Sequence, residues 1–196
     1  MSRPIKVTNE QIITTARRCF LECGANIPAM NIADKLGISH TTIFNRFGSK
    51  EALMIAALGP EENISWLDIL ETGPDERPIQ EQLVEHCKVI SHYFQDMVRG
   101  FSVLESAGIS TKKIFARQKG ESQPIKAFRT LASWLKRAQI RGLITECDID
   151  TLSITILGAL HNRAFTKYFC DTEKSNDIND EYIELFIALL WNGIRK

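Results

Sequence analysis

Apolar residues recur at helical spacing along almost the whole chain, and no run of alternating β-branched residues is long enough to indicate a sheet. We therefore expect an all-α protein. The first helix is predicted to begin after Thr8, because Thr8 and Gln11 have the spacing of a capping box, and to end at Gly24. Its inward stripe is formed by Ile12, Ala16, Cys19, Phe20 and Cys23.

Two short helices are predicted next, with a tight turn between them. The first spans about residues 29–36, and Gly37 can end it in the left-handed conformation. Ser39 is a good N-cap for the second, which runs to Phe47 and is anchored by Ile43 one turn before that residue. Ser49 then caps a fourth helix that begins at Lys50. Helix, short turn, helix is the helix-turn-helix unit.

The outer face of the third predicted helix is short and polar. At 100° per residue, Thr41 and Asn45 lie opposite the anchoring residues, with Thr42 and Phe44 beside them. A helix of this length is not stable alone, so the supporting helices must hold it. Such a face suits insertion into a DNA major groove, and an inert connector is the structural alternative.

These residues carry a family resemblance. The segment ITTARRCFLECGANIPAMNIADKLGISHTTIFNRFGSKEALM resembles the N-terminal DNA-binding domain of the TetR family of transcriptional repressors, from about Glu10 to Ala56. The resemblance implies a three-helix DNA-binding domain over residues 1–49 and a larger helical ligand-binding and dimerisation domain over 50–196. It also implies a ligand-responsive repressor that binds a palindromic double-stranded DNA operator as a homodimer.

The family's DNA contacts can be transferred by position. The residues implied are Ser39, His40, Thr41, Thr42, Phe44, Asn45, Arg46 and Lys50, with Lys50 holding a phosphate. Four positions depart from the family pattern: Phe44 stands where tyrosine is usual, Thr41 where a small residue or proline is usual, and Pro28 and Met30 replace a serine or threonine and an arginine. A helical ligand-binding or scaffold dimer whose head does not bind DNA therefore remains the alternative function.

Charge is divided unevenly along the chain. The total is zero, with 24 basic and 24 acidic residues. The first 50 residues hold seven basic and three acidic side chains, whereas the remaining 146 hold 17 and 21. A basic head on an acidic body is the distribution expected for a protein that docks one end on phosphate.

The remainder of the chain predicts further helices. They are expected at about residues 50–58, 63–70, 81–98, 124–142, 150–168 and 181–194, with a polar connector over 170–180. Gly59-Pro60 interrupts the fourth helix, and this break is either a joint that takes part in signalling or a static corner.

The last two predicted helices are apolar around most of their circumference, so a partner chain is expected to cover them. The interface residues predicted from this pattern are Leu157, Leu160, Phe186 and Leu190. A fully intramolecular core is the alternative.

A ligand pocket is expected between the body helices. Its predicted lining is Trp66, Ile90, Phe94, Met97, Phe101 and Trp134, which would favour an apolar or aromatic effector. The same residues also fit a plain hydrophobic core.

No enzyme signature accompanies these features. GxSxG, HExxH, P-loop and Rossmann patterns are absent from the sequence, and neither the four histidines nor the five cysteines have the spacing of a metal site. We therefore expect no catalysis, no metal and no cofactor, and we interpret Cys19 and Cys23 as small hydrophobic residues in a reducing cytoplasm.

The longest apolar run, residues 185–191, is too short to span a bilayer, and the polar start of the chain does not resemble a signal peptide.

Overall fold

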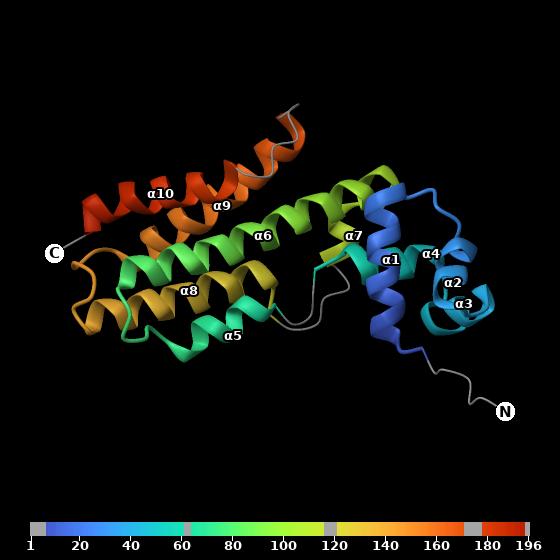
Figure 1. Ribbon diagram of the computed structural model, residues 1–196, viewed down its shortest axis with the longest axis horizontal. Helices are drawn as coiled ribbons and strands as arrows, with labels where there is room; N and C mark the ends of the chain where they lie inside the picture. Colours follow the sequence, from blue (N-terminus) through green and yellow to red (C-terminus); the bar gives the residue numbers. More distant parts are fainter. Residues whose placement is uncertain (1–6, 61–63, 116–120, 171–177, 195–196) are drawn as a thin grey trace. The chain divides into compact units, whose positions relative to one another are not determined.

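The computed structural model describes residues 7–60, 64–115, 121–170 and 178–194. These residues form ten helices and no strand, which confirms the all-α prediction (Figure 1). In chain order the helices are α1 (Asn9–Cys23), α2 (Ala29–Leu36), α3 (His40–Phe47), α4 (Lys50–Leu58), α5 (Ser65–Thr72), α6 (Ile79–Ser106), α7 (Thr111–Phe115), α8 (Gln123–Ile140), α9 (Ile149–Cys170) and α10 (Ile178–Ile194).

The chain divides into two compact units. The head contains Met1–Pro60 and Arg99–Gln118, and the body contains Glu61–Val98 and Lys119–Lys196. The division falls inside α6, so the last turns of that helix and all of α7 belong to the head. This differs from the domain boundary after residue 49 that the sequence suggested, because α4 packs with the helices that precede it.

Local signals define the helices at the start of the head. The Thr8 hydroxyl accepts a hydrogen bond from the Gln11 backbone N–H at 3.2 Å, and the Gln11 side chain accepts one from the Thr8 N–H at 2.8 Å. Gly37 ends α2 in the left-handed conformation, with φ 64° and ψ 30°, and the following Ile38 N–H reaches back to the Ala33 carbonyl at 3.1 Å. The turn that leads into α3 is therefore closed by backbone hydrogen bonds.

Every helix of the head contributes buried residues to the core of that unit. Phe20, Ile32, Ile43 and Leu53 are fully buried in it, one from each of the first four helices. The second segment of the head adds Leu104, Ile109 and Ile114 to the same cluster. One sequence expectation was wrong: Cys19 is buried, but Cys23 is exposed. Cys23 is the last residue of α1 and lies past the edge of the core.

A close helix contact joins α4 and α6 within the head. Gly100 is buried, and a Cβ atom at this position would lie 2.6 Å from the Leu58 carbonyl oxygen. Leu58 is the last residue of α4, as predicted, and Gly59 continues in an extended conformation with φ −72° and ψ −179°. Only glycine at residue 100 allows the two backbones to approach this closely.

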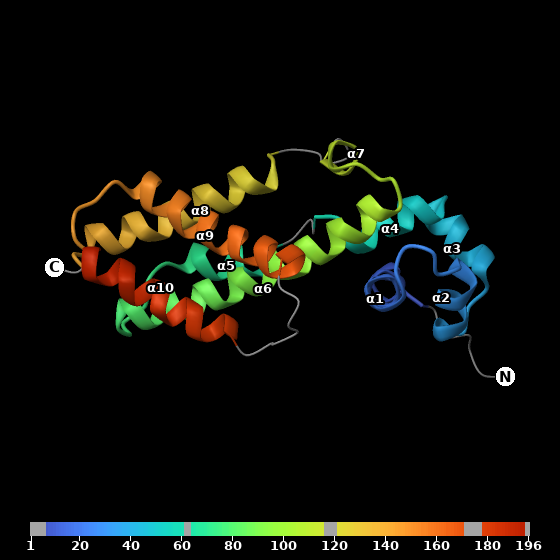
Figure 2. The same cartoon turned by 90° about the horizontal axis from the view of Figure 1, so that it is seen from above.

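The body is built around α8, which packs against α5 and α9 (Figure 2). Its core contains Trp134 and Leu135 of α8, together with Leu83 and Ile90 of α6 and Ile156 of α9. Burial raises the pKa of the Cys87 thiol in this core to about 12, so Cys87 is a neutral side chain there.

Polar contacts also hold body helices together. Lys88 of α6 makes ion pairs with Asp180 at 3.3 Å and Glu184 at 2.8 Å, both on α10. Arg137 of α8 donates to the carbonyl oxygens of Leu70 at 2.6 Å and Glu71 at 2.9 Å, which are among the last carbonyls of α5. The second contact satisfies acceptors that a helix end leaves without partners.

The helix boundaries of the body differ in part from the expected ones. Helix α6 runs to Ser106, eight residues beyond the predicted end at Val98, and α10 begins at Ile178 within the predicted polar connector. Residues 171–177 of that connector lie outside the described residues. In the part of the chain that the structure describes, no helix is long and apolar enough to cross a membrane.

Candidate nucleic-acid interface

Helix α3 has one face in the head core and one face in solvent. Ile43 is fully buried and Phe47 is half-buried, as the anchoring edge predicted. The Ser39 hydroxyl accepts from the Thr42 backbone N–H at 3.2 Å and also lies 2.9 Å from the Thr42 hydroxyl. These two hydroxyls are therefore used to start the helix, although both residues were also predicted as DNA contacts.

Four of the predicted contact residues form the exposed face. They are His40, Thr41, Phe44 and Asn45, which are spaced so that all four lie on one side of the helix. The His40 and Phe44 rings meet edge to face, with centroids 6.3 Å apart and planes at 82°. Phe44 is 37% exposed although it has no polar atom, so an apolar surface lies directly beside the Thr41 and Asn45 polar groups.

Arg46 and Lys50 have different surroundings. The Arg46 guanidinium donates to the Val7 carbonyl oxygen at 2.5 Å and to Asn9 Oδ1 at 3.4 Å, which ties the end of α3 to the start of α1. Lys50 opens α4 behind its N-cap Ser49, whose hydroxyl accepts from the Ala52 N–H at 3.0 Å. We propose that Lys50 holds a phosphate and that Arg46 mainly positions α3.

The start of α2 departs from the family pattern as expected. Pro28 is its N-cap and makes no side-chain hydrogen bond, and Met30 is exposed. A side-chain phosphate contact from Pro28 is therefore not possible, and Met30 places an apolar side chain in solvent there.

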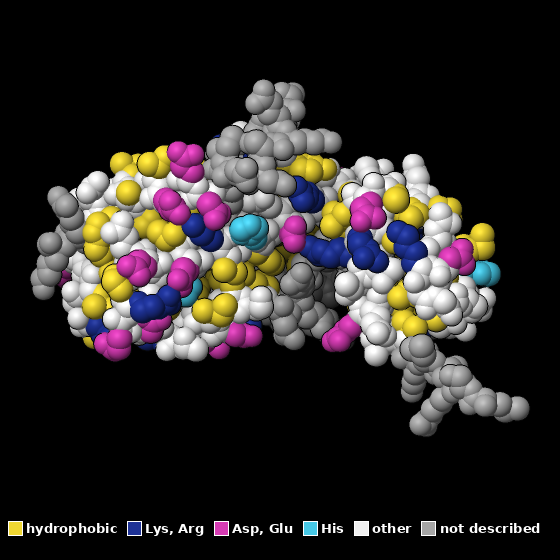
Figure 3. Space-filling model, in the orientation of Figure 1, with side chains coloured by type: hydrophobic (Ala, Val, Ile, Leu, Met, Phe, Trp, Pro, Cys, Tyr) yellow, Lys and Arg dark blue, Asp and Glu magenta, His cyan; other side chains and the backbone are white. Residues whose placement is uncertain are grey.

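The difference in net charge is larger between the two structural units than between the first 50 residues and the rest of the chain. The head contains 11 basic and 5 acidic residues, a net charge of +6, and the body contains 13 basic and 19 acidic residues, a net charge of −6. Figure 3 shows dark-blue basic side chains on the visible face of the head and magenta acidic ones spread over the visible face of the body. The second head segment accounts for the increase over the value from the first 50 residues, because it adds Arg99, Lys112, Lys113 and Arg117.

The predicted ligand residues do not form one group. Trp66, Ile90 and Trp134 are buried in the body core, and Phe94 and Met97 are half-buried on α6. Phe101 belongs to the head instead, where its ring meets that of Phe115 edge to face with centroids 5.8 Å apart. The sequence could not separate these residues because one continuous helix, α6, contributes to both units.

The predicted interface residues are also less exposed than expected. Leu160 is fully buried in the chain's own core, and Leu157, Phe186 and Leu190 are half-buried against it. The exposed apolar side chains of the last two helices are instead Ile154, Phe165, Tyr168, Phe169, Leu185 and Leu189. We call this set the α9–α10 face. The sequence alone does not identify these residues, because a helix that is apolar all round does not indicate which of its faces is turned inward.

The head has the architecture of a helix-turn-helix DNA-binding domain, with its recognition helix in solvent. Residues 12–57 match the sequence model of the bacterial regulatory proteins of the tetR family. The chain therefore carries the DNA-binding domain of the TetR family of bacterial transcriptional regulators, and the recognition made from the sequence is confirmed.

The whole chain has the fold of solved regulators. It is 19% identical, with a TM-score of 0.68, to a structure that describes the control of antibiotic production by a bacterial hormone, and the match covers 99% of this chain and 100% of that one. A TetR regulator from Streptomyces coelicolor is 21% identical with a TM-score of 0.62, covering 96% and 98% of the two chains. A TetR-family regulator from Pseudomonas syringae is 18% identical with a TM-score of 0.59, covering 97% and 98%. At these identities the likeness establishes the fold. No curated protein sequence matches the chain.

Proposed function

We propose that this DNA-binding regulator is a homodimeric repressor that binds a palindromic operator and is released from it by a small-molecule effector. The observation that carries the proposal is the outward face of α3. His40, Thr41, Phe44 and Asn45 are exposed there, whereas Ile43 anchors the helix in the core. Short polar side chains on an exposed helix can reach base edges in a major groove.

The apolar surface of the last two helices supports a dimer. Leu185 and Leu189 lie one turn apart on α10, and Ile154 and Phe165 are exposed on α9. Exposed apolar side chains gathered on adjacent helices are typical of a protein interface. A two-fold dimer would place two α3 helices about 34–36 Å apart, or a multiple of that spacing, on a palindromic site.

No group of three or more metal-ligating side chains occurs among the described residues, and we propose that the protein acts by binding alone, without cofactor or catalysis. We also propose that the protein acts in the bacterial cytoplasm, where a regulator of this family would meet its operator.

Salt-dependent binding to the DNA that flanks its own gene tests the function. A repressor should bind this DNA tightly and lose affinity steeply as salt rises, since each neutralised phosphate releases counterions. Absence of binding at low salt would favour the alternative function, a ligand-binding dimer with an inactive head. The observation that keeps this alternative is Phe44, which cannot donate the phosphate hydrogen bond of a tyrosine.

Replacing Lys50 by alanine should weaken binding to all DNA sequences alike. If Lys50 neutralises one phosphate in each protomer's contact, the slope of log K against log salt should fall by about 1 per half-site. The measurement is a salt titration by fluorescence anisotropy. Lys35→Ala is the matched control, because Lys35 is an exposed head lysine that pairs with Glu22 at 3.9 Å. Equal slopes for the wild type and Lys50→Ala would show that Lys50 does not contact the backbone.

Replacing Asn45 by alanine should relax sequence preference at one position of each half-site. An asparagine amide can make two hydrogen bonds to an adenine edge, and the loss of such a pair costs about 1–3 kcal/mol. Competition binding against operators changed one base pair at a time measures this preference. Asn26→Ala provides a control for the loss of an exposed asparagine outside α3. Unchanged specificity would assign base reading to His40 and Thr41 instead.

A further inference from the structure

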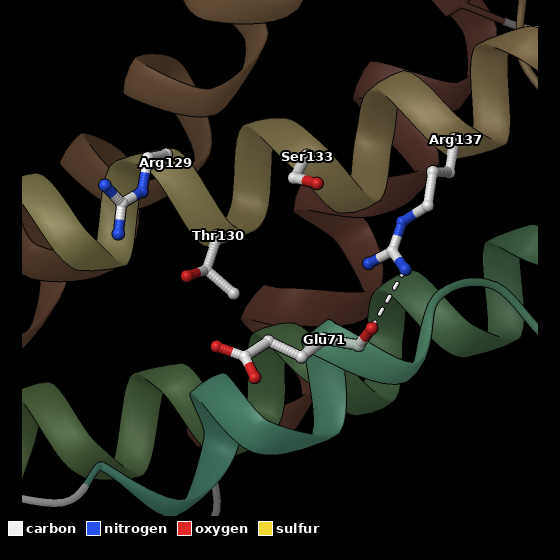
Figure 4. A pocket seen from close by; sticks show the side chains of 5 residues that line it. All are labelled: Glu71, Arg129, Thr130, Ser133 and Arg137. Atoms are coloured by element: carbon white, nitrogen blue, oxygen red, sulfur yellow. Dashed lines mark hydrogen bonds between the residues drawn. The ribbon is translucent and has the colours of Figure 1, made fainter.

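A polar pocket lies between α5 and α8 of the body (Figure 4). It has a volume of about 320 Å³ and is lined by Glu71, Arg129, Thr130, Ser133 and Arg137. None of these residues belongs to the aromatic set that the sequence suggested for a ligand. The volume is at the small end of the range for ligand sites, and the lining is polar where most ligand sites are apolar.

The pocket residues of α8 share one face of that helix. Arg129, Ser133 and Arg137 follow one another at intervals of four residues, and Thr130 lies beside the first of them. Figure 4 shows the Thr130 side chain and the Glu71 carboxylate turned toward the same space between the helices. Two guanidinium groups, two hydroxyls and one carboxylate therefore line one open hollow, in which Thr130 is buried and Glu71, Arg129 and Ser133 are exposed.

Arg137 is held in place before any ligand binds. Its two terminal nitrogens donate to the Leu70 and Glu71 carbonyl oxygens, and its Nε is buried without a hydrogen-bond partner among the described residues. Gly73 leaves room for the guanidinium, since a Cβ atom there would lie 2.9 Å from Arg137 Nη1. A positive charge fixed in this way costs little ordering entropy when an anion binds.

Among the other groups of the pocket, the exposed Arg129 pairs through Nη2 with Glu121 at 2.7 Å, so a ligand meets its remaining N–H groups. No hydrogen bond or ion pair of the Thr130 hydroxyl, the Ser133 hydroxyl or the Glu71 carboxylate occurs within the described ranges. The guanidinium groups favour an oxyanion, the hydroxyls can donate or accept, and the carboxylate can only accept. A ligand that satisfies all of them has an anionic group at one end and hydroxyl groups at the other.

We propose that this pocket is the effector site, and that it binds a small hydroxylated organic anion through Arg129 and Arg137, with Glu71, Thr130 and Ser133 binding its hydroxyl groups. The proposal rests on the effector-responsive function proposed above and names its ligand class. The anion is a carboxylate or a phosphate ester, and the experiment separates these two.

The test is calorimetric binding to the full-length protein without DNA. The probes are D-gluconate and glycerol 3-phosphate, with neutral glycerol and apolar hexanoate as chemical controls. At least one hydroxylated anion should bind the wild type, and Arg129→Gln should weaken that binding about tenfold, the value of a lost charge-assisted hydrogen bond. Lys136→Gln removes the same charge from an exposed position of α8 outside the pocket lining and should leave the affinity unchanged.

A second variant, Glu71→Gln, tests whether the negative charge of Glu71 opposes the binding of an anion in the pocket. Inorganic phosphate should bind this variant more tightly than it binds the wild type, because one opposing negative charge has been removed. The assignment fails if neither hydroxylated anion binds the wild type, or if Arg129→Gln binds as the wild type does. The role of the hydroxyl groups would be overturned if the wild type bound hexanoate as tightly as it binds D-gluconate. It would also be overturned if the wild type bound inorganic phosphate as tightly as glycerol 3-phosphate.

DNA binding is then measured separately, so the two proposals can fail independently. An operator complex that is released by an apolar compound but by neither anion would keep the proposed function and overturn this site. Anion binding by a protein that binds no operator would overturn the repressor function instead.

Discussion

Leu189→Glu is expected to convert the proposed dimer into a folded monomer that no longer binds the proposed operator tightly. Leu189 is 72% exposed in the single chain, so a charge there does not disturb the core of the protomer. In a dimer that covers the α9–α10 face, the same charge is buried without a partner. A two-fold interface contains each residue twice, so a cost of about 2 kcal/mol per copy weakens dimerisation roughly a thousandfold.

Sedimentation velocity at micromolar concentration measures the change in assembly. Ile140→Glu is the matched control, because Ile140 is 74% exposed on α8 and does not belong to the α9–α10 face. Leu160→Glu provides a contrast, since Leu160 is fully buried and its replacement should unfold the protomer. If Leu189→Glu remains a dimer, the partner covers another surface and the proposed interface is wrong.

Gly100→Val is expected to destabilise the head and to weaken DNA binding with it. The new Cβ atom would meet the backbone oxygen of Leu58, and a backbone atom cannot rotate away as the end of a side chain can. Helix α4 must then move away from α6, at a cost of about 1–3 kcal/mol, typical of an overpacked core. Because α4 packs against α1 and α3, its displacement also changes the support of the recognition helix.

Urea unfolding followed by circular dichroism measures the loss, and an operator titration measures its effect on binding. Arg99→Leu is the control for an apolar side chain at an exposed neighbouring position of the same helix, and it applies to the unfolding measurement. Gly100→Ala should give a smaller loss of the same sign. A valine variant as stable as the wild type would show that the α4–α6 contact can open without cost.

The first four helices of the head could be predicted closely because their signals are local. The capping box at Thr8, the left-handed Gly37 and the caps Ser39 and Ser49 each act within one turn of the chain, and each is present in the structure. Their spacing also determined which side of α3 faces solvent. Arg46 was the exception, since its partner, the Val7 carbonyl, lies 39 residues earlier in the chain and no local pattern reports it.

For the body, the sequence predicted the helices but not the polar pocket between α5 and α8. The aromatic residues looked like a pocket lining, yet Trp66 and Trp134 are buried in the core, and Phe101 packs in the other unit. The polar pocket joins Glu71 to residues about sixty positions later in the sequence, on a helix that carries other charges in solvent. Scattered arginines and hydroxyls on helix surfaces have no spacing that distinguishes a ligand site from a solvated face.

The sequence by itself therefore determined the first four helices and the outward face of α3, because capping, periodicity and glycine conformation depend on neighbouring residues. The tertiary structure decided which faces of α9 and α10 are covered, which unit each part of α6 joins and where charged side chains converge. Leu160 and Leu189 illustrate the reason: both are leucines in apolar helices, but Leu160 is fully buried and Leu189 is 72% exposed. Burial depends on which other helices pack against a face, and that packing is set by contacts between residues far apart in the chain.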